Sequence, residues 1–205
     1  MKVYFAPDDA VGHGQPLDAQ WARSAVGGPS FPLRNRAARA MFRCIWILAA
    51  AWTPPPLHGW RCAILRLFGA RVGRGVRIYG STSVWHPANL VLHDHALIGP
   101  RVRLYNQGTV TIGARAVVSQ GAQLCASTHR LDDPEFQLVL RPIEIGARAW
   151  VAAEAFVGPG VRIGAGAVLG ACSVALGDLV EWTVYRGNTA EPVRSRAMAA
   201  GDGPC

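Results

Sequence analysis

The chain has 205 residues, of which 50% are hydrophobic and 17% are charged, and its formal net charge is +8 at pH 7. This composition excludes an intrinsically disordered protein, and the length suits one main domain with a short additional segment. Nearly all of the positive charge is arginine, which favours phosphate, carboxylate or an anionic membrane face. Because no recognition helix, clustered basic stripe or aromatic stacking motif accompanies it, we expect no nucleic-acid partner.

Residues 1–34 are predicted to form an N-terminal tail. They contain no basic head followed by an apolar stretch, the pattern that marks a secretory signal. The five cysteines are scattered without a CxxC pair, which favours a reducing compartment. We therefore expect a cytoplasmic protein.

Residues 35–70 are predicted to form a helical cap segment. Asn35 to Trp52 and Leu57 to Phe68 each indicate a short helix, and the breaker Thr53-Pro54-Pro55-Pro56 separates them. The first helix combines arginines with tryptophans, as helices that lie on a membrane surface do. The alternative interpretation is a cap over the open end of the domain that follows. Both interpretations stay open, and with the first we expect peripheral contact with the inner membrane.

From Val72 onward the sequence repeats with a period of six residues. A glycine follows the aliphatic position in many repeats, where it is expected to form a sharp corner, and a small residue stands four positions after it. Neither an α-helix nor a set of ordinary hairpins has this period, so a tightly coiled sheet is predicted. The aliphatic positions are Val72, Ile78, Val84, Leu92, Ile98, Leu104, Ile112, Val118, Leu124, Ile145, Val151, Val157, Ile163 and Leu169.

The hexapeptides IGARAV at Ile112 to Val117 and VGPGVRIGAGAVLG at Val157 to Gly170 resemble those of the hexapeptide-repeat acyltransferases. The resemblance extends from Val72 to about Asn188. It implies an all-β fold, a left-handed parallel β-helix of hexapeptide repeats with a short helical N-terminal segment, and a homotrimer. On this basis we expect the β-helix at residues 71–180 with a loop at 129–142, followed by a C-terminal tail at 181–205.

The six-residue period is lost between Leu124 and Ile145, where a polar, turn-rich loop is expected to carry function. The segment LCASTHRLDDPEF is similar to the sugar O-acetyltransferase branch of the family, and more narrowly to the acetyltransferases of colanic acid and related exopolysaccharide pathways. In that branch a histidine at the position of His129 is the catalytic base. The resemblance therefore implies direct transfer of acetyl from acetyl-CoA to a hydroxyl group of a saccharide acceptor.

Two further catalytic groups are expected beside His129. Arg130 stands where the branch has an aspartate, so the carboxylate that orients the imidazole is left open between Asp132, which we place in the catalytic set, and the alternatives Asp133 and Asp94. The resemblance also implies that the side-chain amide of Asn106 helps to stabilise the oxyanion. Cys125 is expected to have a packing role, in preference to that of a nucleophile.

The resemblance places acetyl-CoA along the C-terminal coils, in the groove between neighbouring subunits. The closing element Gly-Asn-Pro of the family has Thr189 in place of its proline, and Glu191 follows where a basic residue is common. For the arginines of this region, a solvated basic tail is the alternative. The residues implied to bind the cofactor are Trp150, Ala152, Gly170, Ala171, Arg186, Asn188 and Arg194.

Histidines also occur in the early coils, at His86, His93 and His95, but no set of cysteines or carboxylates completes a metal shell there. We therefore expect no metal. Two alternative functions remain at this point: a non-catalytic hexapeptide-repeat scaffold, and an acetyltransferase that acts on an amino sugar, serine or a xenobiotic.

Overall fold

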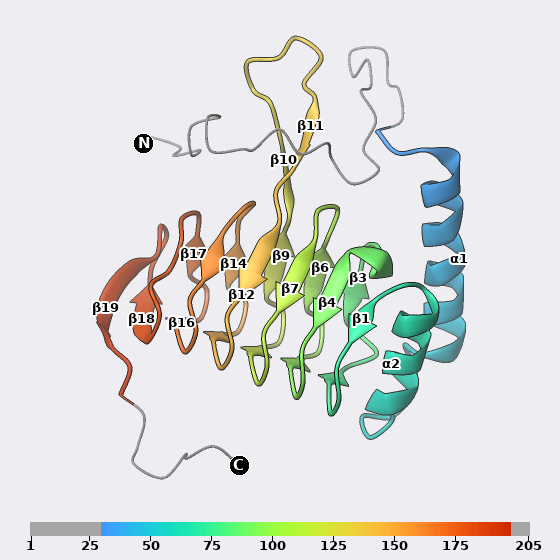
Figure 1. The fold of residues 1–205 in the computed structure, drawn as a ribbon, viewed down its shortest axis with the longest axis horizontal. Helices are drawn as coiled ribbons and strands as arrows, with labels where there is room; N and C mark the ends of the chain where they lie inside the picture. The colour runs from blue at the N-terminus through green and yellow to red at the C-terminus, as the bar shows by residue number, and fades with distance from the viewer. Residues whose placement is uncertain (1–29, 198–205) are drawn as a thin grey trace.

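The computed structural model describes residues 30–197, in which two helices stand at one end of a stack of β-coils (Figure 1). The helices are α1 (Leu33–Ala49) and α2 (His58–Leu67), close to the two helices predicted from the sequence. The predicted N-terminal tail lies, apart from its last few residues, outside the described residues. The division of the chain into domains stays a prediction.

Each coil contributes one strand in turn to three parallel sheets, which form the three sides of the solenoid. The first sheet consists of β1 (Arg71–Val72), β4 (Leu90–Leu92), β7 (Val110–Ile112), β12 (Ile143–Ile145) and β15 (Arg162–Ile163). The second sheet consists of β2 (Arg77–Ile78), β5 (Leu97–Ile98), β8 (Val117–Val118), β13 (Trp150–Val151), β16 (Val168–Leu169), β18 (Thr183–Arg186) and the antiparallel β19 (Glu191–Ser195). The third sheet consists of β3 (Ser83–Val84), β6 (Arg103–Tyr105), β9 (Gln123–Cys125), β14 (Phe156–Val157) and β17 (Val174–Ala175).

Two short elements interrupt this order. A 3-10 turn, η3 (Pro87–Asn89), precedes β4, and an antiparallel hairpin of β10 (Ser127–His129) and β11 (Leu138–Leu140) lies between β9 and β12. The hairpin projects from the solenoid beyond the ends of the other coils (Figure 1).

The core is a column of stacked aliphatic side chains, as the six-residue period predicts. Ile98 pairs with Ile78 on one side and Val118 on the other, and all three are completely buried. The small residues four positions later, such as Ala116 and Ala149, are also completely buried. Because identical positions stack on one another, each coil buries its apolar residues against its neighbours.

The glycines that follow the aliphatic positions have a different role from the one expected. The left-handed backbone of the corners is found two residues later, at Arg115 (φ 58°) and Arg148 (φ 58°), and not at Gly113 or Gly146. A Cβ at Gly146 would lie 2.5 Å from the backbone nitrogen of Ala165 in the next coil. Glycine is required there because adjacent coils approach closely, so the expectation that it makes the turn itself was wrong.

The two helices cover the first coil. The indole Nε1 of Trp46 donates to the carbonyl oxygen of Gly80 at 3.0 Å, which ties α1 to the coil. Arg61 of α2 is completely buried and its guanidinium donates to the carbonyl oxygens of Thr53, Pro54, Pro55 and Ile78 and to Oγ1 of Thr53. This is the position expected of a cap. Neither helix within residues 30–197 is long and apolar enough to cross a membrane.

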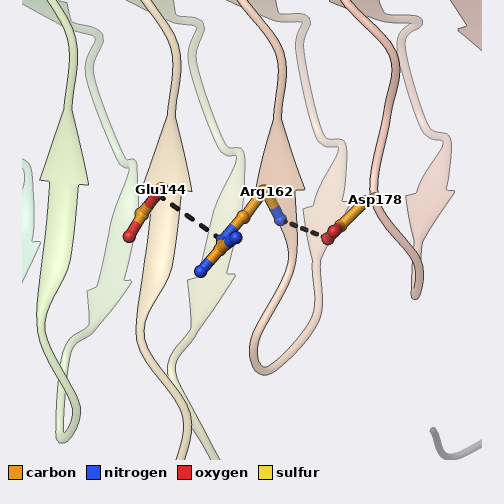
Figure 2. A network of polar contacts seen from close by, with 3 residues as sticks. All are labelled: Glu144, Arg162 and Asp178. Atoms are coloured by element: carbon orange, nitrogen blue, oxygen red, sulfur yellow. Dashed lines mark hydrogen bonds and ion pairs between the residues drawn. The ribbon is translucent and has the colours of Figure 1, made fainter. Parts of the chain in front are cut away.

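Near the other end of the solenoid, a side chain supplies one acceptor of the hydrogen-bond ladder of the first sheet, which the backbone of Leu179 otherwise continues (Figure 2). The N–H of Glu144 donates to the carbonyl oxygen of Val161 in the next coil, whereas the N–H of Arg162 donates to Oδ1 of Asp178 at 2.8 Å. On the outer surface of the same sheet, Nε of Arg162 lies 3.6 Å from Oε2 of Glu144, between side chains that are 71% and 58% exposed.

Candidate functional site

The hairpin leaves and re-enters the solenoid at the corner that joins the third sheet to the first, which we call the third–first corner. Its strands pair Ser127 with Leu140 and His129 with Leu138. At its base the carbonyl oxygen of Ala126 accepts from the N–H groups of Gly108 and Arg141. The segment expected to be a loop is therefore partly an ordered ladder, and His129 is the last residue of its first strand.

The imidazole of His129 is held by the opposite side of the hairpin. Its Nδ1 lies 2.8 Å from the carbonyl oxygen of Phe136, and its ring stacks on the Phe136 ring with centroids 4.6 Å apart and an interplanar angle of 10°. Because a carbonyl oxygen can only accept, Nδ1 must carry the proton in the neutral ring. Nε2 is then left with its lone pair, as a general base requires.

Among the described residues no carboxylate is hydrogen-bonded to His129, and the place of Asp132 in the catalytic set stays a prediction. Asp132 is exposed, Asp133 accepts the N–H of Glu135 at 2.8 Å, and Asp94 accepts the N–H of Arg74 in the first coils. A backbone carbonyl takes the orienting role instead. Such a group has no side-chain identity, so the sequence could not reveal it.

The expected role of Asn106 stays a prediction, and in this structure its amide is engaged within the coils. Its side chain is completely buried; Oδ1 accepts from the N–H groups of Trp85 and His86, and Nδ2 donates to the carbonyl oxygen of His86 at 2.6 Å. The amide thus ties the chain before η3 to the next coil.

Two neighbouring hollows that share lining residues lie between α1, the third sheet and the hairpin. The first, of about 750 Å³, is lined by His129, Gln107 and the first turns of α1. The second, of about 1000 Å³, is a groove between α1 and the outer face of the third sheet. Neither lining contains an aspartate or glutamate among the described residues. Both linings contain Arg36, Arg39, Trp85, Tyr105 and Cys125.

Burial changes the ionisation of two side chains in these linings. It raises the pKa of the Tyr105 phenol, with a smaller contribution from the nearby Cys125, and it lowers the pKa of the Arg39 guanidinium. Tyr105 is therefore a neutral hydroxyl at physiological pH, and its oxygen accepts from Nε2 of Gln107 at 3.0 Å. Arg39 remains a cation, because an arginine starts from a pKa far above that range.

Cys125 faces outward, contrary to the expected packing role. It alternates with the fully buried Leu124 along β9, and its side chain lines both hollows. Its Sγ contacts the carbonyl oxygen of Ser127 at 3.5 Å.

The residues expected to bind the acetyl-CoA donor gather elsewhere, at the corner that joins the second sheet to the third, which we call the second–third corner. Trp150 is 44% exposed on β13, and its Nε1 donates to Oγ of Ser119. Ala152, Gly170 and Ala171 lie in stacked turns of this corner, and the exposed Arg186 and Asn188 continue the stack. Arg194 is also exposed and lies on the edge strand β19, opposite Val184. None of them lines the hollows beside His129. Within one chain, the predicted donor residues and the predicted base therefore lie on different corners.

The described residues contain no group of three or more histidine, cysteine, aspartate or glutamate side chains that could hold a metal ion. Sequence reasoning missed Arg39, Trp85 and Tyr105 as parts of the site. A signal for two of them exists, since Trp85 and Tyr105 directly follow the inward-facing aliphatic positions Val84 and Leu104 of the third sheet and so point outward. Nothing in the sequence indicates that Arg39 lies against them.

No protein-family model matches the sequence. Among known proteins it is similar to WcaF of Escherichia coli (strain K12), assigned as a colanic acid biosynthesis acetyltransferase. The two are 39% identical over 175 residues, which cover 83% of this chain and 96% of WcaF.

Solved structures show the same fold at lower identity. A maltose O-acetyltransferase from Clostridium difficile 630 gives a TM-score of 0.72 at 20% identity, covering 82% of this chain and 90% of that chain. A hexapeptide-repeat acetyltransferase from Vibrio cholerae O1 biovar eltor, solved with acetyl coenzyme A, gives a TM-score of 0.73 at 22% identity, covering 82% and 93%. These likenesses confirm the predicted left-handed parallel β-helix.

Proposed function

Because the chain belongs to the family of the acetyltransferase WcaF, we propose that it transfers acetyl from acetyl-CoA to a hydroxyl group of a saccharide in exopolysaccharide or cell-surface saccharide biosynthesis. The enzyme class follows from the family. The name of WcaF supports the saccharide acceptor, and the maltose O-acetyltransferase is a fold neighbour with a sugar substrate.

The observation that carries the proposed mechanism is the hydrogen bond from Nδ1 of His129 to the carbonyl oxygen of Phe136. It supports the tautomer in which Nε2 can accept a proton, and the stacked Phe136 ring fixes the plane of the imidazole. The hollow beside His129 has room for a saccharide, at about 750 Å³.

In the proposed reaction the acceptor hydroxyl attacks the thioester carbonyl carbon while Nε2 of His129 takes the hydroxyl proton. The tetrahedral adduct collapses with cleavage of the carbon–sulfur bond, and the imidazolium returns the proton to the departing thiolate. The products are the acetylated saccharide and free CoA, and His129 ends in its starting state. No acyl-enzyme is formed.

For the donor, we propose the set Trp150, Ala152, Gly170, Ala171, Arg186, Asn188 and Arg194 at the second–third corner. The chemistry of this corner suits the ligand, since small residues expose turn backbones to a pantetheine chain and the exposed arginines can pair with phosphates.

A homotrimer would bring the two halves of the site together. The second–third and third–first corners lie on either side of the third sheet, so a threefold arrangement can set the donor corner of one copy beside the His129 hairpin of the next. Sedimentation equilibrium tests this: a monomer with full activity would contradict it.

We also propose peripheral contact with the cytoplasmic face of the inner membrane. Along α1 and just after it, Leu33, Met41, Leu48 and Trp52 are exposed by 76%, 56%, 73% and 73%, and they recur at helical spacing on the side away from the coils. No acidic residue occurs between residues 30 and 93, which suits an anionic lipid surface. Flotation with phosphatidylglycerol vesicles should carry the wild type and not Leu48→Glu; equal flotation of both would argue against this face.

The proposed reaction is tested by thiol release from acetyl-CoA with a panel of sugars, nucleotide sugars and lipid-linked saccharides. We expect acceptor-dependent release by the wild type, and a loss of about a hundredfold or more in His129→Ala, the usual contribution of a general base. Binding of CoA to His129→Ala provides the control for folding. Equal rates in both proteins would remove His129 from the mechanism. No thiol release by either protein, together with no binding of CoA, would favour a scaffold.

A further inference from the structure

One flank of α1 presents a row of arginines to the groove. Arg36, Arg39 and Arg43 line it from the helix, and Arg103 lines it from β6. Among residues 30–197, no ion pair involves any of these four side chains. At 1.5 Å per residue, the helical arginines span about 10 Å. The groove thus holds positive charge over a length greater than that of one carboxylate group, and no acidic side chain of residues 30–197 lines it.

Arg39 is held in a fixed orientation. Its Nε donates to Oδ1 of Asn35 at 2.9 Å, and its guanidinium carbon lies 3.9 Å from the centroid of the Trp85 ring. Within the described part of the chain, its two terminal nitrogens make no hydrogen bond. A guanidinium fixed by one edge and one face, with its other donors unused, is suited to bind an oxyanion in a bidentate manner.

The route from these arginines to His129 is lined by groups that suit a sugar ring. The groove and the His129 hollow share Trp85 and Tyr105, whose rings offer apolar faces. Gln107, which lines the same hollow, is only 7% exposed, and its Oε1 has no hydrogen-bond partner among the described residues. A buried acceptor without a partner is costly, and a sugar hydroxyl could satisfy it.

We infer that the groove binds the diphosphate of a diphosphate-linked saccharide acceptor, with the diphosphate on Arg39 and its neighbours and the sugar between Trp85, Tyr105 and His129. This inference rests on the proposed function for the reaction and adds the chemical class of the acceptor. A neutral acceptor would leave the row of guanidinium groups without a ligand. The diphosphate can come from a nucleotide or from a prenyl carrier, which share this group.

Calorimetric titration with inorganic pyrophosphate, UDP and geranyl diphosphate tests the groove directly. Saturating CoA is present throughout to occupy the donor site, since UDP could otherwise enter it. We expect binding that weakens about tenfold or more in Arg39→Gln, because a charge-assisted bidentate contact is lost. The matched control Arg34→Gln removes an exposed arginine of the same helix and should change the affinity less than about twofold. Tighter binding of UDP indicates a nucleotide carrier, and tighter binding of geranyl diphosphate indicates a prenyl carrier.

Three results would overturn the inference: no binding of any probe, equal affinities for wild type and Arg39→Gln, or equal weakening by Arg34→Gln. Thermal melting of each variant with and without CoA separates misfolding from loss of the site, and Arg39→Lys, which keeps the charge without the planar fork, should recover only part of the affinity.

An activity measurement separates this inference from the proposed function. With a diphosphate-linked acceptor that supports transfer, Arg39→Gln should raise KM about tenfold with a much smaller change in kcat, whereas His129→Ala should lower kcat. If pyrophosphate binding depends on Arg39 but His129→Ala transfers acetyl normally, the proposed mechanism is contradicted and the inference that the groove binds a diphosphate is supported. If His129→Ala is inactive but Arg39→Gln binds and reacts like the wild type, the inference about the groove is contradicted and the proposed mechanism is supported.

Discussion

In the coils, each strand shares its hydrogen bonds with the next coil, whereas the junction between α1 and α2 depends on the guanidinium of Arg61. The N–H of Leu97, for example, donates to Ala116, and the N–H of Val117 donates to Ala149 in turn. Arg61, completely buried, supplies donors to four carbonyl oxygens and a hydroxyl of the chain around it. Stabilisation is distributed over many similar contacts in one region and concentrated in one side chain in the other.

This difference predicts that the largest single loss of stability comes from the cap. Arg61→Met should lower the free energy of unfolding by about 3 kcal/mol or more, since five hydrogen bonds made by a completely buried side chain are lost. Urea denaturation followed by circular dichroism measures it. The control Arg34→Met, at an exposed position of α1, should stay within about 0.5 kcal/mol. A loss below about 1 kcal/mol for Arg61→Met would show that the junction is not held by this residue.

A smaller loss is expected from a methyl group placed between coils. Gly146→Ala puts a Cβ 2.5 Å from the backbone nitrogen of Ala165, so the adjacent coils must move apart. This strain should lower the free energy of unfolding by about 1–3 kcal/mol. Gly177→Ala is the matched control, because a Cβ there meets nothing within 4 Å. The melting temperature of Gly146→Ala should therefore be clearly lower than that of Gly177→Ala. Equal melting temperatures would mean that the coils yield to such a contact without cost.

The smallest effects are expected on the outer surface of the first sheet (Figure 2). Asp178→Ala removes the acceptor of the Arg162 N–H and should cost about 1 kcal/mol, whereas Asp178→Asn should retain most of that bond. Glu144→Gln breaks only an exposed ion pair and should cost less than about 0.5 kcal/mol. Urea midpoints at low and high salt measure both, and a larger loss for Glu144→Gln than for Asp178→Ala would reverse the interpretation of this network.

The same contrast explains what could be predicted from the sequence. Ile98 and Ala116 belong to a repeat, so their burial follows from their place in the period and the fold was predicted correctly. Arg61, the carbonyl of Phe136 and the Arg39–Trp85 contact each occur once and join segments that no period relates. The motif around His129 predicts it as the base, but the group that orients its ring could not be predicted, because a backbone carbonyl belongs to every residue alike.

The hairpin that carries His129 begins and ends beside one point of the solenoid, and the coils continue across it in register. Ile143 pairs with Val110, and Ile145 with Ile112, as if the intervening residues were absent. Insertions, deletions and substitutions in the hairpin can therefore accumulate without displacing the strands on either side. A lineage of such enzymes could therefore lengthen or recombine this one excursion while the coils keep the residues of the second–third corner in place.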